Sequence, residues 1–294
     1  MTHQFTTQTV NCHNIAVGVK ALQQGGFTAW YDAQVELFTS DHSNLKSSSY
    51  PSFANRTQRA RRPLEYRQDL LHYNVLYAGD HFARLTTLLS QLRENGNPQA
   101  VCLEPIQLKV FDYGCGQGLA SLALMQHLAG RQVSIELHLV EPSALALQAA
   151  VAYTQAQAQH HAIQLQVHAH HCGLDQLSNE LFTLQPQQSA VHLFSNVLDL
   201  AVDGVFDLNV LLEQIKKMSG KQLCLAVSPN YPEGRLGFLQ LLDGLPTQRF
   251  SSAKYLVNTD NLVTQALSFR LTSGSIQMYT PKRACAVALQ FRVA

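Results

Sequence analysis

The chain carries little charge for its length. Charged residues make up 14% of its 294 residues, and 21 Lys and Arg against 20 Asp and Glu leave a net charge of +1. Non-specific binding of nucleic acid needs many cations that neutralise phosphates. The composition therefore excludes a protein that binds nucleic acid through its bulk charge, so any such binding must depend on a local basic patch.

Long apolar runs and paired cysteines are missing as well. No stretch approaches the roughly 18–20 uninterrupted apolar residues of a membrane helix, and the longest candidate, 197–212, is interrupted by three aspartates. The six cysteines are scattered without a CxxC pair, which excludes a disulfide framework and a zinc ribbon. The N-terminus lacks the basic and apolar regions of a signal peptide. We therefore expect a reduced, soluble, cytoplasmic protein.

From residue 101 onward, short apolar runs alternate with amphipathic stretches. Strands are expected at 108–112, 135–141, 163–168 (where apolar residues alternate), 190–194 and 223–227, and helices at 119–129, 144–157 and 208–218. Strands separated by helices predict a parallel sheet that is covered on both faces. The end of the chain differs, because 266–271 and 284–292 are expected to pair as an antiparallel hairpin that finishes the sheet.

The first hundred residues follow another pattern. Residues 1–68 look irregular, with a turn at Gln23–Gly26. Apolar residues at helical spacing begin at Asp69, and Gly79 is expected to end this first helix so that Asp80 caps a second. We therefore divide the chain into a partly helical N-terminal cap, 1–100, and an α/β domain, 101–294.

The most informative segment is a glycine-rich turn, VFDYGCGQG at 110–118. The strand ends at Asp112, and glycines at 114, 116 and 118 lead into a helix. Alternating glycines permit a tight turn and leave no Cβ between the chain and a ligand. The dinucleotide fingerprint would need its third glycine at position 119, which is Leu, and the Lys-Ser/Thr of a P-loop is missing. The turn therefore differs from both nucleotide motifs.

An acid stands where the second strand ends. Glu141 follows Gly118 by 23 residues and is itself followed by Pro142. A carboxylate at this point lies in the crevice at the carboxyl ends of the strands, where it can accept hydrogen bonds from both hydroxyls of a ribose. Strand, glycine turn, helix, strand and acid together indicate a site for a nucleoside-containing cofactor.

These two segments, VFDYGCGQG and LVEP, resemble the class I S-adenosylmethionine-dependent methyltransferases over about 105–294. The resemblance implies a Rossmann-like sheet of seven mostly parallel strands whose last strand is antiparallel, with S-adenosyl-L-methionine as cofactor. It also implies that the glycine loop packs on the methionine part and that the acid holds the ribose. The cofactor-binding residues would be Asp112, Gly114, Gly116, Gly118 and Glu141, with Asp175 as the one acid near the adenine. Cys172, or the backbone beside it, is the alternative to Asp175.

In the resembled family the segment after the fourth strand lies beside the transferable methyl group. Here that segment contains Asn196 and Asp199, our catalytic candidates. Amino-directed nucleic-acid methyltransferases often have Asn/Asp-Pro-Pro-aromatic here, a motif that orients the exocyclic amine of a base. This chain lacks the prolines, so that role is not inferred for it. Alternatively, Ser195 and Asn196 only cap the following turn. If the acceptor must lose a proton, His192, Asp199, His72 and Tyr73 are candidates for the base, and none stands out.

Two further segments suggest partners. The run 55–67 has five arginines, which with Tyr66 suit phosphate binding and base stacking. These are Arg56, Arg59, Arg61, Arg62 and Arg67. A solvated loop is the alternative. Tyr231, in the loop after the fifth strand, is expected to line the acceptor site.

Histidines crowd the segment 160–172, which ends in Cys172. Imidazoles with a thiolate suit zinc, but His168 and His170 would share one face of a strand while adjacent histidines point apart. We therefore expect a solvated histidine-rich edge without a metal.

The sequence predicts a methyltransferase, with RNA or another nucleic acid slightly favoured as acceptor over protein or a small molecule. Two rivals stay open. One is an inactive, cofactor-binding subunit that presents its N-terminal cap to a partner. The other is a different nucleoside-cofactor enzyme, such as an oxidoreductase.

Overall fold

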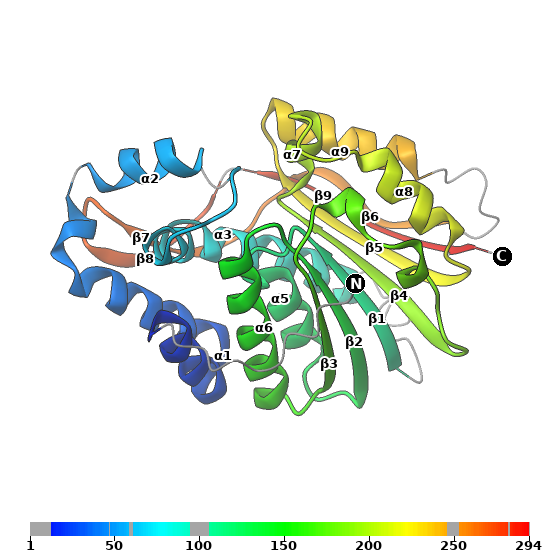
Figure 1. Ribbon diagram of the computed structural model, residues 1–294, viewed down its shortest axis with the longest axis horizontal. Coiled ribbons are helices and arrows are strands. Elements are labelled where there is room, and N and C mark those ends of the chain that lie inside the picture. The colour runs from blue at the N-terminus through cyan, green and yellow to red at the C-terminus, as the bar shows by residue number, and fades with distance from the viewer. Residues whose placement is uncertain are drawn as a thin grey trace.

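A seven-stranded sheet forms the centre of the computed structural model, which describes residues 13–46, 48–58, 61–94, 106–245, 253–281 and 283–293. Its strand order is β3-β2-β1-β4-β5-β9-β6 (Figure 1). The strands are β1 (Ile106–Tyr113), β2 (Val133–Val140), β3 (Gln164–His170), β4 (Gln188–Ser195), β5 (Gly220–Pro229), β6 (Lys254–Leu262) and β9 (Ala284–Val293). Strands β1 to β5 are parallel, and β9 is antiparallel to β5 and β6. The predicted Rossmann-like, mostly parallel sheet is confirmed.

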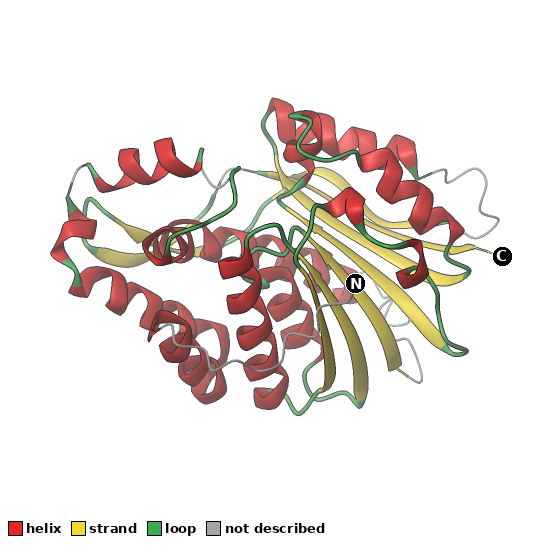
Figure 2. Ribbon diagram, in the orientation of Figure 1, coloured by secondary structure: helices red, strands yellow, loops and turns green. Residues whose placement is uncertain are grey.

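Helices cover both faces of this sheet (Figure 2). The helices are α1 (His13–Ser40), α2 (Ser49–Thr57), α3 (Arg67–Glu94), α5 (Leu119–Leu128), α6 (Ala144–His160), α7 (Leu198–Val202), α8 (Leu208–Lys217) and α9 (Pro232–Gly244), with 3-10 turns η1 (His42–Leu45), η2 (Leu174–Gln176) and η3 (Asn179–Leu181). Alternate residues of each strand face opposite layers. Leu137 of β2 packs in the layer of α3, α5 and α6, whereas Phe111 and Phe194 pack in the layer of α7 to α9.

The predicted pairing of the terminal hairpin is wrong. Strand β7 (Ala266–Arg270) pairs with β8 (Ser275–Tyr279) in a separate two-stranded sheet that packs on α3, and β9 instead pairs with β5 and β6. A turn with Gly274 at φ +63° closes β7 directly onto β8. The apolar run of β9 is buried between two strands. Strand β6 lies at the edge of the sheet, and its many polar residues gave no strand pattern in the sequence.

The expected break at Gly79 is also wrong, because α3 continues through it. A Cβ at Gly79 would lie 1.8 Å from the carbonyl oxygen of Leu267 in β7. Glycine therefore allows the hairpin to approach the helix rather than ending it. The segment read as irregular is helical over α1, and the turn expected at Gln23–Gly26 is a kink in it, with Gly26 at φ +65°.

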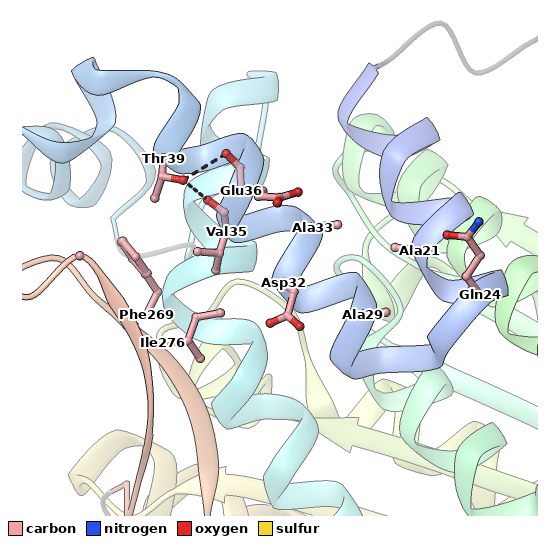
Figure 3. A pocket seen from close by; sticks show the side chains of 11 residues that line it. Ala21, Gln24, Ala29, Asp32, Ala33, Val35, Glu36, Thr39, Phe269 and Ile276 are labelled. Atoms are coloured by element: carbon pink, nitrogen blue, oxygen red, sulfur yellow. Dashed lines mark hydrogen bonds between the residues drawn. The ribbon is translucent and has the colours of Figure 1, made fainter.

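The N-terminal helices share a buried core with the sheet. Trp30 of α1 and Leu88 of α3 are fully buried in the same cluster as Leu137. The boundary between 1–100 and 101–294 stays a prediction. Within the described part of the chain, no helix combines the length and the apolar character needed to cross a membrane. A hollow lies between α1 and the β7–β8 hairpin, and Asp32, Glu36 and Ile276 are among the residues that line it (Figure 3).

Candidate active site

The glycine loop after β1 places one glycine beside open space. All three glycines have left-handed backbones, with φ +62° at Gly114, +51° at Gly116 and +80° at Gly118. A Cβ at Gly114 would lie 2.6 Å from Val197, and one at Gly118 would lie 3.2 Å from Thr154. A Cβ at Gly116 would meet no atom within 4 Å. Two glycines are thus required by packing, whereas Gly116 leaves room for a ligand.

Glu141, directly after β2, is tied to this loop. Its Oε2 accepts a hydrogen bond from the Gly116 N–H at 2.9 Å, and its Oε1 accepts one from the Ser143 N–H at 2.9 Å. Only 8% of the residue is exposed. Burial raises the pKa of Glu141 to about 7, although both hydrogen bonds act in the opposite direction. Each oxygen keeps a lone pair, so the carboxylate can also accept from ligand hydroxyls.

The other two predicted cofactor acids make contacts within the protein. Asp112 is buried under α5, where its Oδ2 accepts from the Oγ of Ser121 at 2.6 Å and from its N–H at 3.2 Å. Burial raises the pKa of Asp112 to about 6. Asp175, in η2, accepts from the Asp207 N–H at 3.0 Å through Oδ2. Asp112 therefore fixes the start of α5 and Asp175 the start of α8, and direct cofactor contact by either stays a prediction.

Asn196 follows β4 in a left-handed conformation, with φ +58°. Its Oδ1 accepts from Nη1 of Arg84 at 2.6 Å, and its Nδ2 donates to Oγ of Ser195 at 3.0 Å. The following helix α7 has Val197 at its N-cap and no side-chain capping bond. Asn196 therefore does not act as the helix cap considered above. It joins the end of β4 to α3.

Asp199, the second catalytic candidate, lies in the first turn of α7 and is 6% exposed. Its Oδ2 accepts a hydrogen bond from the hydroxyl of Tyr231, in the loop after β5. Burial and this hydrogen bond raise the pKa of Tyr231. Arg61 approaches from the N-terminal region, with Nη2 3.8 Å from Asp199 and Nη1 2.7 Å from Asp203. The structure thus brings Asp199 and Tyr231 together, as their positions after β4 and β5 predict.

Helix α3 adds polar side chains to the same edge of the sheet. The Tyr73 hydroxyl lies 2.9 Å from Nδ1 of His81. Burial lowers the pKa of His81 to about 3, and the charge of Arg84 adds to this effect, so the imidazole is neutral. Burial also raises the pKa of Tyr73, and the negative charges of Glu141 and Asp199 add to it. Tyr73 therefore lies within electrostatic range of both Glu141, the predicted cofactor acid, and Asp199, the catalytic candidate.

Two other candidates for the base lie in the core. His192 is fully buried, with Nδ1 2.9 Å from the Tyr113 hydroxyl and Nε2 2.9 Å from Oε1 of Gln222. Burial lowers its pKa to about 4. His72 is 2% exposed, and its ring stacks on Phe53 at 5.5 Å. Both imidazoles are buried, and a role as the base stays a prediction for each.

Sequence reasoning missed three side chains of α3. Arg84 is buried beside Asp80, which also accepts a hydrogen bond from the Tyr279 hydroxyl of β8. His81 partners Tyr73. Their spacing by four, at 73, 77 and 81 and again at 80 and 84, is a weak signal, because the helix carries other polar residues and the spacing does not tell which face meets the sheet. Spacing by four places such residues on one face.

The arginine run does not form one unpaired basic surface. Arg56 is bound by Asp69, with Nε 3.0 Å from Oδ2, and Arg61 is held by Asp203. Arg62, Arg67 and Tyr66 are exposed, and Arg59 lies outside the described residues. The interpretation as a nucleic-acid patch must therefore rest on fewer side chains than the sequence offers.

The histidines of the segment 160–172 do not form a single cluster in the structure. His160 and His161 end α6, and Nε2 of His171 lies 2.9 Å from the carbonyl oxygen of Pro142. His168 and His170 share a face of β3, as their spacing predicts, and there they meet side chains of β2.

No family model and no curated protein matches this chain in sequence. Among solved structures, it is similar to a precorrin-6y C5,15-methyltransferase from Geobacter metallireducens, at TM-score 0.37 and 11% identity over 72% of this chain and 87% of that one. A SAM-dependent O-methyltransferase from Thermotoga maritima is similar at TM-score 0.39 and 10% identity, over 69% and 65%. The plantazolicin methyltransferase in complex with SAH is similar at TM-score 0.37 and 14% identity, over 95% and 99%. Likenesses this distant concern the fold alone.

Proposed function

We propose that this chain is an S-adenosylmethionine-dependent methyltransferase. The observation that carries the proposal is the geometry at Gly116, where a left-handed glycine borders open space and its N–H is held by Glu141 at 2.9 Å. The strand order, with β9 antiparallel beside β5, supports the same family. A dinucleotide-dependent oxidoreductase would need a different glycine spacing.

The residues present fit the cofactor. Gly116 offers a backbone that a ligand can approach closely, and Glu141 offers two acceptor oxygens at the tip of β2. Leu174, buried beside Gly114, offers an apolar surface near the end of β3. The bound cofactor supplies a methyl group on a sulfonium, which is already activated for transfer. The protein therefore contributes mainly by positioning the acceptor.

The acceptor is positioned by the side chains after β4 and β5 and on α3. Asn196 fixes the guanidinium of Arg84 at the edge of the site. Asp199 can receive a proton from an acceptor hydroxyl or amine if Tyr231 yields its place on the carboxylate. The neutral His81 orients the Tyr73 hydroxyl. In this arrangement the N-terminal region, 1–100, acts as the substrate-binding part of the enzyme.

The acceptor that this arrangement supports best is a small polar molecule. Near the edge of the site Arg61 pairs with Asp203, and Arg56 pairs with Asp69. Binding of a long polyanion would need these cations to leave their carboxylates. The buried Arg84 and the half-buried Asn196 instead suit a ligand that enters and hydrogen-bonds to them directly.

Two measurements test the proposal. Calorimetric titration with S-adenosylhomocysteine and with NAD should show binding of the first alone. NAD binding without S-adenosylhomocysteine binding would favour an oxidoreductase. Transfer of a radioactive methyl group into size-separated cell-extract fractions should then label small molecules. Label in RNA would reverse the acceptor proposal, and cofactor binding without label in any fraction would indicate an inactive binding subunit.

A further inference from the structure

A second polar cluster lies on β2 and β3, outside the proposed active site. Glu136, His138 and His168 each offer one ligand atom, and these atoms lie within 4.8 Å of one another. His138 and His168 are direct cross-strand neighbours, and their rings stack with centroids 4.7 Å apart. Glu136 stands two residues before His138, on the same face of β2. Three donors thus converge on a rigid part of the sheet.

We propose that Glu136, His138 and His168 form a zinc-binding site. Two imidazole nitrogens and a carboxylate oxygen are ligands that Zn²⁺ accepts, and three protein ligands leave a fourth position open. Oε1 of Glu136 lies 2.8 Å from Nε2 of His138. Two ligands of a tetrahedral zinc stand roughly 3.3 Å apart, given metal–ligand bonds of about 2.0–2.1 Å. A small outward rotation of the two side chains would therefore admit the ion.

Neighbouring side chains already orient two of the three ligands. Nδ1 of His138 lies 3.0 Å from Nε2 of His170. In the structure Nε2 of His138 donates to the Glu136 carboxylate, so Nδ1 accepts from His170. Zinc binding requires the other tautomer, in which Nδ1 donates to His170 and Nε2 is available to the metal. Oε2 of Glu136 accepts from Nε2 of Gln188 at 2.8 Å, which directs Oε1 toward His138. Such outer partners fix ring orientation and tautomer in metal sites.

The cluster is partly exposed, because Glu136 and His168 are half-buried while His138 is buried. The described chain between β3 and β4 contains only the short turns η2 and η3, whereas α7, α8 and α9 gather over β4, β5 and β9 (Figure 1). The Glu136 side chain is 26% exposed. One cation already competes for it, because Nζ of Lys109 lies 3.2 Å from Oε1 of Glu136 and 3.2 Å from the Thr183 carbonyl oxygen. Zinc must displace or tolerate this ammonium group.

The first experiment titrates the untagged, chelator-treated full-length protein with Zn²⁺ against a chromophoric chelator. Wild type should bind one ion, and His168→Gln should lower the affinity by at least about tenfold, the loss seen even when outer-shell partners are removed. The matched control is His171→Gln, because His171 stands three residues away and bonds Pro142 instead. It should bind as wild type does. No stoichiometric binding by wild type, or equal affinity in wild type and His168→Gln, would overturn the proposal.

The second experiment separates a built site from a generally sticky histidine surface. Lys109→Met removes the competing charge and keeps the length of the side chain. Zinc affinity should rise by about fivefold or more, the scale of one charge a few ångströms from a divalent ion in water. Zn²⁺ should also raise the Tm of wild type but not of His168→Gln, since a ligand that binds only the folded state stabilises it. An unchanged affinity in Lys109→Met, or equal Tm shifts in wild type and His168→Gln, would count against the three-residue site.

Discussion

The two halves of the proposed active site are built in different ways. In the cofactor half, Gly116 and Glu141 are only 25 residues apart, and the bond between them involves a backbone N–H. In the acceptor half, Arg84 reaches Asn196 across 112 residues. A third bond, from Tyr279 to Asp80, spans 199 residues. One half is local backbone geometry, and the other is a set of side chains assembled by the whole fold.

This difference explains why the cofactor half has a recognisable sequence motif, whereas the acceptor half was predicted only from the positions of its residues after the strands. A left-handed turn requires glycine, so backbone geometry leaves a visible pattern. A buried arginine in the middle of a helix leaves none unless its distant partner is known. The cofactor half should therefore be sensitive to backbone strain, and the acceptor half to loss of single polar side chains.

The largest expected effect is from Gly116→Val. A β-branched residue at φ +51° is strained, and its side chain would fill the space left for the cofactor. Binding of S-adenosylhomocysteine should be abolished in calorimetry. The control is Gly130→Val at the other end of α5, where φ is +77° and a Cβ likewise meets nothing within 4 Å. Comparable strain there should leave cofactor affinity intact. A folded Gly116→Val protein with unchanged affinity would remove the loop assignment.

Asn196→Gly tests the acceptor half. Glycine tolerates the φ of +58°, so the backbone is kept while the bond to Arg84 is lost. The methyl-transfer rate should fall by about ten- to a thousandfold, the range of lost positioning. Cofactor affinity should change little, because Gly116 and Glu141 are untouched.

The matched variant is Asn196→Asp, which keeps an acceptor oxygen for Arg84 and should restore most of the rate. A large loss of cofactor affinity in Asn196→Gly would show that Asn196 supports the fold of the edge rather than the acceptor. Equal rates in the glycine and aspartate variants would show that the bond to Arg84 is irrelevant to transfer.

Much of the sheet could be predicted from the sequence. The runs at 108–112, 135–141, 190–194 and 223–227 each lie within or overlap a strand of the structure, because strands buried on both faces read as continuous apolar segments. The edge strand β6 and the kinked helix α1 were missed, since their apolar residues are diluted by polar ones and glycine. The break predicted at Gly79 was wrong, because the glycine is required by the close approach of strand β7 and not by the end of a helix.

In the candidate site, too, features set by the local sequence could be predicted and those set by distant contacts could not. Gly116, Glu141, Asn196 and Asp199 lie along the carboxyl edge of β1, β2 and β4, as strand order predicts. Arg84 and His81 could not be found, because helical spacing alone does not tell which face of α3 meets the sheet. The sequence pattern overstated how many arginines of the run are free to bind phosphate. The acids that pair with Arg56 and Arg61 come from α3 and from the segment after β4, which the local sequence does not show.

Glu141→Ala should have a smaller effect than the two changes above. The variant loses charge-assisted hydrogen bonds to the ribose, which would weaken S-adenosylhomocysteine binding by about 1–3 kcal/mol. The 2′-deoxy analogue of S-adenosylhomocysteine tests whether Glu141 contacts the ribose 2′-hydroxyl. Wild type should discriminate against it, and Glu141→Ala should bind both ligands equally. If the mutation weakens both ligands by the same factor, Glu141 supports the loop and not the ribose.

The smallest effect is the pH dependence of cofactor binding. Burial raises the pKa of Glu141 to about 7 from an ordinary 4.5, so below about pH 7 the free folded protein favours the protonated carboxyl. Its contribution to folding stability is thus fully present below pH 4.5 and is lost as pH rises through about 7. Ribose hydroxyls donate to the ionised form, so affinity should change in the opposite direction.

Affinity for S-adenosylhomocysteine should accordingly increase by up to about tenfold between pH of about 6 and about 8. Glu141→Gln isolates this group, because Asp112, whose pKa burial raises to about 6, still titrates in that variant. Calorimetry at about three pH values across this window should give a flat profile for Glu141→Gln and a rising one for wild type. An identical rise in both proteins would assign the proton to Asp112 or to the ligand, and the cofactor half would then owe its affinity to the loop backbone rather than to its acid.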